Sequence, residues 1–442
     1  MFYLATTEAA LARHAAFVPL AAAHGIDSTM LSAAEVAAMM PAAARRWLGG
    51  LWTPSDLRTE PWVAVPALAR LAAARGVRVV EHCAVRALDV AAGRVTGMVT
   101  EQGRIAAPAV VLPGGAWSGL MLSRHGVGLP QLLVRATVAR TETLPEVFGG
   151  AASDGRIAFR RRADGGYTLA AGGAAELFLG PPAFKNAARY RPVLRRNPFA
   201  IRPLGPPPAG HPDAWTTPRT WAEDGPSPFE AMRVLDPAPS RRRLAAIRAE
   251  FGATFPQIGP PVLSHAWAGM IDTLPDVVPV IDTCAALPGL IVATGMSGHG
   301  FGIGPGVGRI VAELVQGHAP RHDLARFRLG RFTDGSTLRP GPGLCGGAAP
   351  SCARGAHDAH DMVPTIDARA FWAGGVEEPD IIGAVRSLGG KHAMPVADLC
   401  IGPLEDARAE VAREGRHLLA RHGAVDGEKV LGLIGREIAR QH

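Results

Sequence analysis

Apolar and polar residues follow patterns that change twice along the chain, and the first pattern is helical. Residues 7–18 are rich in alanine and contain neither glycine nor proline, which predicts a helix that Pro19 interrupts. A second helix is expected over residues 32–40. From Pro66 onward the apolar side chains again share one helical face, and Gly76 is placed to cap the end of that helix.

The segment after Gly76 has the pattern of a β-sheet. Residues 77–81 are rich in valine and predict a strand, which makes this a helix-to-strand step of an α/β sheet. Further strands are expected over residues 89–100, 103–107 and 109–112, with a turn at residues 92–94.

In the middle of the chain the period of the pattern changes to two. Apolar and polar residues alternate between Val134 and Ala139, and residues 157–161 are joined to residues 167–170 across a glycine turn. These features predict half-exposed antiparallel strands. Residues 178–240 are dense in proline and have few periodic runs, so we expect long loops over a sheet there.

The α/β pattern resumes at residue 290. A buried strand is expected over Leu290–Thr294, a glycine-rich loop over residues 295–306, and then an amphipathic helix that Gly317 ends. The predicted fold class is therefore an α/β domain interrupted by an inserted antiparallel β-sheet. A linker rich in glycine and proline follows, and residues near 404–411 and 430–438 predict a helical C-terminal extension.

Composition narrows the class of protein. The chain has 442 residues, of which 48% are hydrophobic and 19% charged, enough for a core and for two or three domains. The net charge is +7, but the arginines are scattered, so we expect a solvated basic surface and no nucleic-acid partner. No transmembrane segment or signal peptide is expected, and five cysteines at unrelated spacings favour a reducing, cytoplasmic location.

The glycine-rich loop is the segment with the clearest chemistry. Glycines between a strand and a helix let the backbone approach a flat or anionic ligand, and the helix presents free N–H groups with a partial positive charge. A tight strand-to-helix turn that binds no ligand is the alternative.

Several segments in the same order resemble the FAD-dependent DAO superfamily, which includes D-amino-acid dehydrogenases, glycine oxidase and sarcosine oxidases. The similarity extends from about Pro66 to Ser336. The matching motifs are the run from Trp267 through Ile281, the segment Pro288-Gly289-Leu290, the loop Ser297-Gly298-His299-Gly300-Phe301, the run from Val110 through Ser118, and the hairpin Gly93-Arg94-Val95-Thr96-Gly97.

The resemblance implies FAD as the cofactor and an amino acid or related small amine as the substrate. Hydride would pass from the carbon beside a neutral amine to flavin N5, giving an imine that water hydrolyses. The implied contacts with FAD are Val85 at the adenosine, Gly115, Ala116 and Trp117 along the dinucleotide, and Ser297, Gly298, His299, Gly300 and Phe301 at the flavin. For His299 a ring held by backbone hydrogen bonds is favoured over a general base, and no catalytic residue is assigned.

The sequence departs from the family at two places. No strand followed by G-x-G-x-x-G is found, so the first βαβ unit of the FAD-binding domain is expected to be absent and the chain to be N-terminally truncated. A catalytically inactive remnant without tightly bound FAD is the alternative function. Gly302 stands where sarcosine-type oxidases have a lysine, so Arg135, Arg160 and Arg161 are candidates for binding a substrate carboxylate.

The expected domains follow from these matches. They are a truncated FAD-binding domain, first part, over residues 1–120, a substrate-binding β domain over residues 121–262, the second part of the FAD-binding domain over residues 263–340, and a linker with helical extension over residues 341–442. A zinc site at Cys345, Cys352, His357 and His360 is not favoured because the gap between the cysteines is too long, so no metal is assigned.

Overall fold

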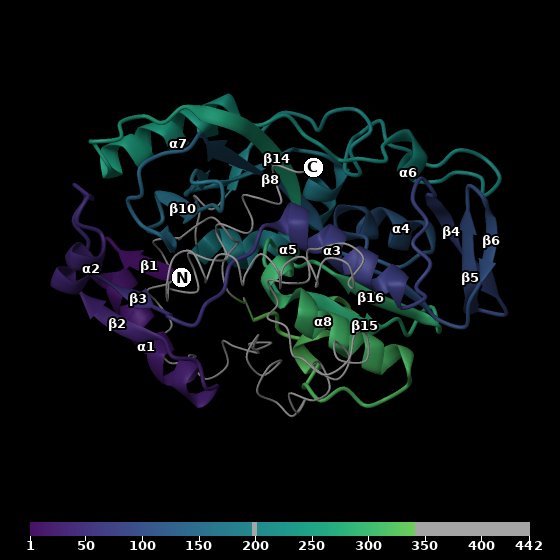
Figure 1. The fold of residues 1–442 in the computed structure, drawn as a ribbon. Coiled ribbons are helices and arrows are strands. Elements are labelled where there is room, and N and C mark those ends of the chain that lie inside the picture. The colour runs from purple at the N-terminus through teal and green to yellow at the C-terminus, as the bar shows by residue number, and fades with distance from the viewer. Residues whose placement is uncertain (197–200, 340, 342–442) are drawn as a thin grey trace, which may run out of the picture. The chain divides into compact units, whose positions relative to one another are not determined.

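The computed structural model of the chain describes residues 1–196, 201–339 and 341 (Figure 1). These residues fall into two compact units. The larger takes in Met1–Glu60 and the described residues from Val80 onward, and Pro61–Val79 belongs to the second. The expected linker and helical extension lie outside the described residues, as do the four residues of the disfavoured zinc site.

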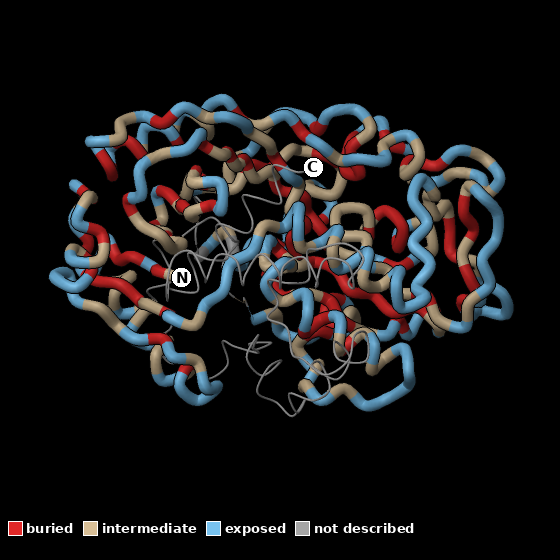
Figure 2. The backbone as a smooth tube through the Cα atoms, in the orientation of Figure 1, coloured by how far each residue is buried: buried red, intermediate tan, exposed pale blue. Residues whose placement is uncertain are grey.

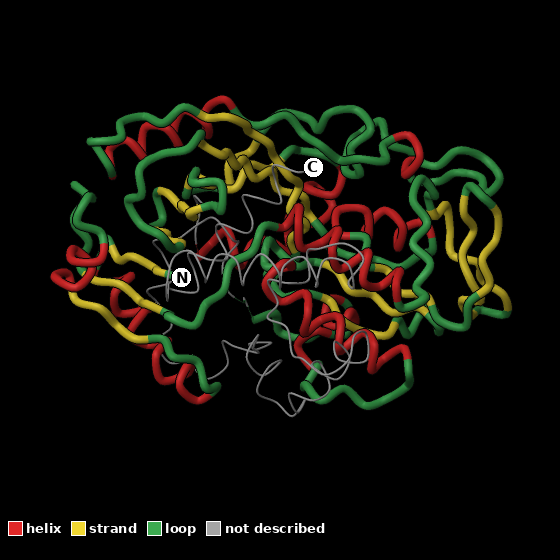
Figure 3. Tube along the Cα trace, viewed as in Figure 1, coloured by secondary structure: helices red, strands yellow, loops and turns green. Residues whose placement is uncertain are grey.

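A ten-stranded sheet dominates the larger unit, and Figure 3 shows its strands in yellow. The strand order is β13-β12-β8-β11-β10-β9-β1-β3-β2, with β14 paired to β8, and most neighbours are antiparallel. The strands are β1 (Phe2–Ala5), β2 (Thr29–Ser32), β3 (Gly49–Trp52), β8 (Leu132–Thr141), β9 (Ala151–Ser153), β10 (Ile157–Arg161), β11 (Tyr167–Ala171), β12 (Ala175–Leu177), β13 (Ile201–Pro203) and β14 (Leu263–Thr273).

One face of this sheet is covered by a core of aromatic rings. Phe159 on β10 and Tyr167 on β11 pack against Phe251 of helix α7 (Arg241–Thr254), and Phe255 follows that helix. The period-two pattern of β10 explains this, because Ile157 and Phe159 are buried and Ala158 between them is half-exposed. The antiparallel strands expected here are confirmed.

The first three strands lie in this sheet and not in the α/β part. β1 pairs in parallel with β9, and β3 pairs with β1, so residues 1–52 extend the antiparallel sheet. The expected boundary, with residues 1–120 in the FAD-binding domain, therefore differs from the pairing seen. The reason is that Phe2 and Leu4 are buried in the same core as Phe159, a long-range contact that local pattern does not reveal.

The α/β part of the larger unit has a small mixed sheet of β15 (Val280–Thr283), β16 (Leu290–Thr294) and β7 (Val110–Leu112). β16 is parallel to β7 and antiparallel to β15. Every residue of β16 is buried, and Figure 2 marks buried stretches in red. Helix α8 (Gly300–Val315) packs on it through Val307 and Ile310. A separate antiparallel sheet joins β4 (Val85–Ala91), β5 (Arg94–Thr100) and β6 (Gly103–Ala106), with the turn where it was predicted.

The remaining elements of the larger unit are shorter or peripheral. They are α1 (Glu8–Ala23), α2 (Ala33–Met39), η1 (Gly115–Trp117), α4 (Ser118–Arg124), α5 (Pro181–Arg196), α6 (Pro228–Ala231), η2 (Ala325–Phe327) and η3 (Leu329–Phe332).

Three local predictions for α1, α5 and α8 were wrong. α1 continues through Pro19, because Pro19 and Ala15 are both exposed and water can bond the carbonyl that loses its partner. Residues 178–240 contain the sixteen-residue helix α5, whose buried side packs against β8 and β12. α8 begins at Gly300, inside the expected loop, because packing of its apolar face outweighs the low helix propensity of glycine.

The second unit contains helix α3 (Pro61–Ala74). None of the residues of this helix is buried. Trp62, Val65 and Leu68 are exposed, as are Val77 and Val79 beyond the helix. The strand predicted over residues 77–81 is not formed. A strand requires a neighbour for its backbone N–H and C=O groups, and no described strand pairs with this segment.

Two kinds of feature are absent from the described residues. No helix among them is long and apolar enough to cross a membrane. Within the same ranges, no group of three or more histidine, cysteine or acidic side chains is arranged to hold a metal ion.

Candidate functional site

The glycine loop after β16 is the first half of the site. It runs from Gly295 to His299, which caps α8. Gly295 has φ +77° and Gly298 has φ +85°, values that glycine adopts readily. A side chain at residue 295 would also collide with Leu274, since an added Cβ would lie 2.2 Å from it. Glycine at this position is therefore required by both conformation and space.

Ser297 in the same loop has a strained backbone. Its φ of +52° is unusual for a residue with a side chain. The Ser297 amide donates to the carbonyl of Asp272 at 3.0 Å, and its hydroxyl donates to the carbonyl of Gly295 at 3.1 Å. These bonds hold the turn, and the serine is fully buried. Such strain at a loop between strand and helix is typical of ligand sites.

The turn after β7 is the second half of the site. It contains Gly114 and the short helix η1, in which Gly115 has φ +50°. Because β7 and β16 are parallel neighbours, the turns at their carboxyl ends leave the same edge of the sheet. The structure thus brings together the two segments that the sequence predicted to bind FAD.

Three polar side chains join the two turns directly. Asp272 Oδ2 accepts from the Gly295 amide at 2.6 Å and from Thr294 Oγ1 at 3.1 Å. Gln131 Nε2 donates to the Gly115 carbonyl at 2.8 Å and lies 3.5 Å from Asp272 Oδ2. Thr294 Oγ1 also lies 3.3 Å from the Gly115 carbonyl oxygen. We call these residues, Gln131, Asp272 and Thr294, the polar bridge.

The polar bridge is buried, and this burial changes the pKa of its one acidic residue, Asp272. Gln131, Asp272 and Thr294 are at most 8% exposed. Burial raises the pKa of Asp272 above its usual value, although the hydrogen bonds from Gly295 and Thr294 act in the opposite direction. Sequence reasoning missed these residues. A signal was present for Asp272, an acid within the apolar run that ends β14.

The N-terminal part of α8 is open on its outer side. An added Cβ at Gly302 or Gly304 would meet no atom within 4 Å, and Phe301 is 49% exposed. The first turn of α8 has no acidic residue. Gly302 and Gly304 therefore place no side chain over the backbone at the start of this helix, which suits a flat or anionic group.

Val85 and Trp117, both expected at the cofactor, lie near a segment that the sequence did not mark. Val85 is half-buried at the start of β4 and pairs with Thr100. Trp117 makes an edge contact with Phe229, with ring centroids 5.6 Å apart. Arg86, the residue after Val85 on β4, forms a bidentate ion pair with Glu230 of α6. The segment around α6 is therefore fixed against β4 and η1.

The three candidate arginines all have partners in the protein. Arg135 donates to Glu176 at 2.9 Å and to the Ala238 carbonyl. Arg160 forms a two-point ion pair with Glu60. Arg161 donates to the Leu144 carbonyl and lies over the ring of Tyr167. The structure does not gather them at one place, since Arg135 and Arg161 lie on the sheet face opposite to Arg160.

Comparison with known proteins decides the family. The sequence pattern of the family described as FAD dependent oxidoreductase matches residues 1–314. The chain belongs to this family. Its members are flavoproteins, so FAD is the cofactor of the family, and the α/β fold class with an inserted antiparallel sheet is confirmed.

Known relatives of the chain are matched over short stretches. The mitochondrial sarcosine dehydrogenase of Mus musculus is 31% identical over 148 residues, which cover 32% of the chain and 16% of that protein. The D-amino acid dehydrogenase of Sinorhizobium medicae is 39% identical over 127 residues, 28% of the chain and 30% of that protein. The matches thus span less than a third of these relatives.

Solved structures match more of the chain. L-Amino acid deaminase from Proteus myxofaciens has a TM-score of 0.70 at 26% identity, covering 75% of both chains. Glycine oxidase from Geobacillus kaustophilus has a TM-score of 0.55 at 20% identity over 75% of this chain and 74% of that one, a likeness of fold alone.

Proposed function

We propose that this chain takes part in the FAD-dependent oxidation of an amino acid or related small amine to an imine. The observation that carries the proposal is the polar bridge. It joins the Gly115 turn and the Gly295 loop, the two segments that the family resemblance assigns to FAD, by hydrogen bonds of 2.6–3.3 Å. Buried bonds of this kind preorganise a binding surface before the ligand arrives.

The residues present fit a flavin. Gly298 and Gly302 are exposed and have no side chain, so the backbone offers a flat surface, and the start of α8 offers N–H groups to an electron-rich edge. Ser297, Gly298, His299, Gly300 and Phe301 would hold the ring system, with Gly115, Ala116 and Trp117 along the dinucleotide and Val85 at the adenosine. When bound, FAD supplies the acceptor for the hydride that leaves the carbon beside the amine.

The sheet next to the loop offers space for the substrate. Gly269 lies three residues before Asp272 on β14, and an added Cβ there would meet no atom within 4 Å. Its partner on β8 is Ala136, also small. Trp267 lies on the same face, two residues along the strand. The protein's part in the reaction would be to orient the amine over this face and to exclude water.

Among the three candidate arginines, Arg160 is the one on this face. Residues paired across neighbouring strands lie on the same face of a sheet. Trp267 pairs with Val138, Val138 with Ala170, and Ala170 with Ala158, so all four share one face. Arg160 is two residues beyond Ala158 on β10 and so shares its face. To bind a substrate carboxylate, Arg160 would release Glu60 and form the ion pair with the substrate instead.

The test is to purify the chain with added FAD, record visible absorbance, and add D-amino acids and N-methyl amino acids without oxygen. We expect flavin to be retained and bleached by at least one amine. Flavin that is retained but not reduced by any amine would contradict the proposed reaction. If no flavin binds at any concentration, the alternative of a catalytically inactive remnant is favoured.

A further inference from the structure

Helix α5 carries an unusual distribution of charge. Its sixteen residues include Lys185 and several arginines but no acid. The helix is anchored from its inner side by the buried Tyr190. Its hydroxyl oxygen lies 2.7 Å from the Thr273 carbonyl oxygen and 3.0 Å from that of Pro130, so its one proton can be donated to either carbonyl. The outer side is therefore held in a fixed orientation.

The basic residues on that outer side lack the partners that arginines have elsewhere in the described structure. Arg86, Arg135 and Arg331 all form ion pairs shorter than 3 Å. Within residues 1–196 and 201–339, no ion pair joins Lys185, Arg191 or Arg195 to an acid, and all three are exposed. Their charges are available to an external anion.

Two aromatic rings are exposed beside these charges. Phe184 is 60% exposed and Trp215 is 59% exposed, and their ring centroids are 5.9 Å apart. The Trp215 indole N–H donates to the carbonyl of Leu179, which fixes the ring at the surface. Two adjacent large aromatics in water are costly unless another surface covers them.

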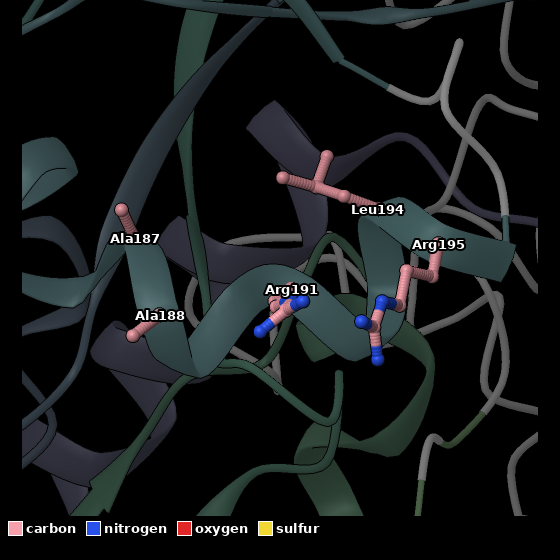
Figure 4. Close-up of a pocket in the computed structure, with 5 residues that line it drawn as sticks. All are labelled: Ala187, Ala188, Arg191, Leu194 and Arg195. Carbon is pink, nitrogen blue, oxygen red and sulfur yellow. The ribbon is translucent and has the colours of Figure 1, made fainter.

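The rings and the charges form one stripe along α5. Phe184, Ala188, Arg191 and Arg195 are spaced by four, three and four residues and so lie on one helical face. Figure 4 shows Arg191 and Arg195 projecting from successive turns. An open hollow of about 590 Å³ lies over this stripe, lined by Ala187, Ala188, Arg191, Leu194 and Arg195.

We infer that the outer face of α5 docks on a bilayer surface that contains anionic phospholipid. Arg191 and Arg195 would bind headgroup phosphates over the alanine floor, and Phe184 and Trp215 would enter the interfacial region, where aromatic rings are favoured. Charge complementarity carries the choice of partner, because the face is basic without a single acid. The aromatic pair favours lipid over nucleic acid, since it lies at the end of a helix and not among basic residues on a sheet.

The experiment is co-sedimentation of the full chain with vesicles of phosphatidylcholine alone or with a third of phosphatidylglycerol. We expect binding only to the anionic vesicles, and weaker binding at higher salt. The double variant R191E/R195E should bind at least about 25-fold more weakly, given roughly fivefold for each arginine charge lost and a further loss from the glutamates that replace them. Phe184→Ser should weaken binding at high salt, where charge contributes least.

The control is R241E/R242E, which makes the same change of net charge at two exposed arginines of α7. It should keep most of the binding. Equal loss in both double variants would show that net charge alone attracts the lipid and would overturn the inference. So would binding of a DNA or RNA oligonucleotide that R191E/R195E abolishes while vesicle binding stays unchanged. The measurement needs neither FAD nor an amine, so its result is independent of the proposed oxidation.

Discussion

Asp272 and Gly295 are 23 positions apart, and the Gly295 amide donates to Asp272 Oδ2 at 2.6 Å. This bond links the end of β14, in the large sheet, to the first residue of the glycine loop. The shape of the loop therefore depends on a carboxylate supplied by another sheet. The same carboxylate lies within 3.5 Å of the Gln131 amide, which bonds the Gly115 turn.

Two replacements of Asp272 should show whether FAD binding depends on its hydrogen-bond acceptor or on its negative charge. Asp272→Ala removes the acceptor and leaves the buried Gly295 amide without a partner, which costs about 1–3 kcal/mol. We expect FAD affinity to fall by roughly tenfold or more as the loop relaxes. Asp272→Asn keeps an acceptor oxygen and should restore most of the affinity. Quenching of FAD fluorescence on titration gives both constants, and equal affinity in the alanine variant would rule out a positioning role.

Gly300→Val should prevent flavin binding. An added Cβ at Gly300 would already lie 3.2 Å from the Cβ of Met296, and a branched side chain would fill the exposed side of the loop. Gly308→Val is the matched control, because it makes the same change in α8 where no atom lies within 4 Å of an added Cβ. Flavin absorbance per protein should be near zero in the first variant and unchanged in the second. Normal flavin content in Gly300→Val would refute the assignment of the loop.

The buried ion pair of Arg331 and Asp276 should be important for stability. Arg331 Nε donates to Asp276 Oδ2 at 2.8 Å, and both side chains are about 5% exposed or less. Arg331→Met would leave a carboxylate buried and uncompensated, which costs about 3–5 kcal/mol. Arg328→Met breaks the exposed pair with Asp334 and should cost about 0–1 kcal/mol. Urea denaturation of the two variants measures both free energies of unfolding, and similar losses would contradict this account.

Asp213 should make stability depend on pH. Burial raises the pKa of this carboxyl group from 3.8 to about 6. Its Oδ1 has no hydrogen-bond partner among the described residues. An acid whose pKa is higher in the folded state favours folding fully below its unfolded pKa, and this contribution is lost as pH rises through the folded pKa.

The melting temperature of the wild-type chain should therefore fall between pH 4 and pH 7. Asp213→Asn should remove this component and gain about 3 kcal/mol at pH 7.5, since the pKa is raised from 3.8 to about 6 and one pKa unit corresponds to about 1.4 kcal/mol. Asp224→Asn, at an exposed acid, is the control and should leave the slope unchanged. Parallel melting curves of wild type and Asp213→Asn at all pH values would show that the carboxyl group does not titrate as described.

The sequence by itself determined the elements whose pattern is local. Leu290–Thr294 is apolar up to Thr294 and flanked by glycine, so its burial on both faces follows from composition. The hairpin of β10 and β11 follows from alternation across a glycine turn, and the family of the chain follows from motifs in order along it. Ser297 to Phe301 and the Gly115 turn were predicted as FAD contacts from the same motifs.

Only the tertiary structure decided which distant residues meet. Asp272 and Gln131 join the two turns because β14 ends beside the loop, and no spacing in the sequence encodes that approach. β1 joins the large sheet because Phe2 is buried with Phe159. Residues 77–81 fail to form a strand because backbone groups need a neighbour, whatever the propensity of valine. Local propensities determine most of the helices and strands. Burial and hydrogen bonds between distant residues exist only in the folded chain, and they determine which residues meet at the candidate site.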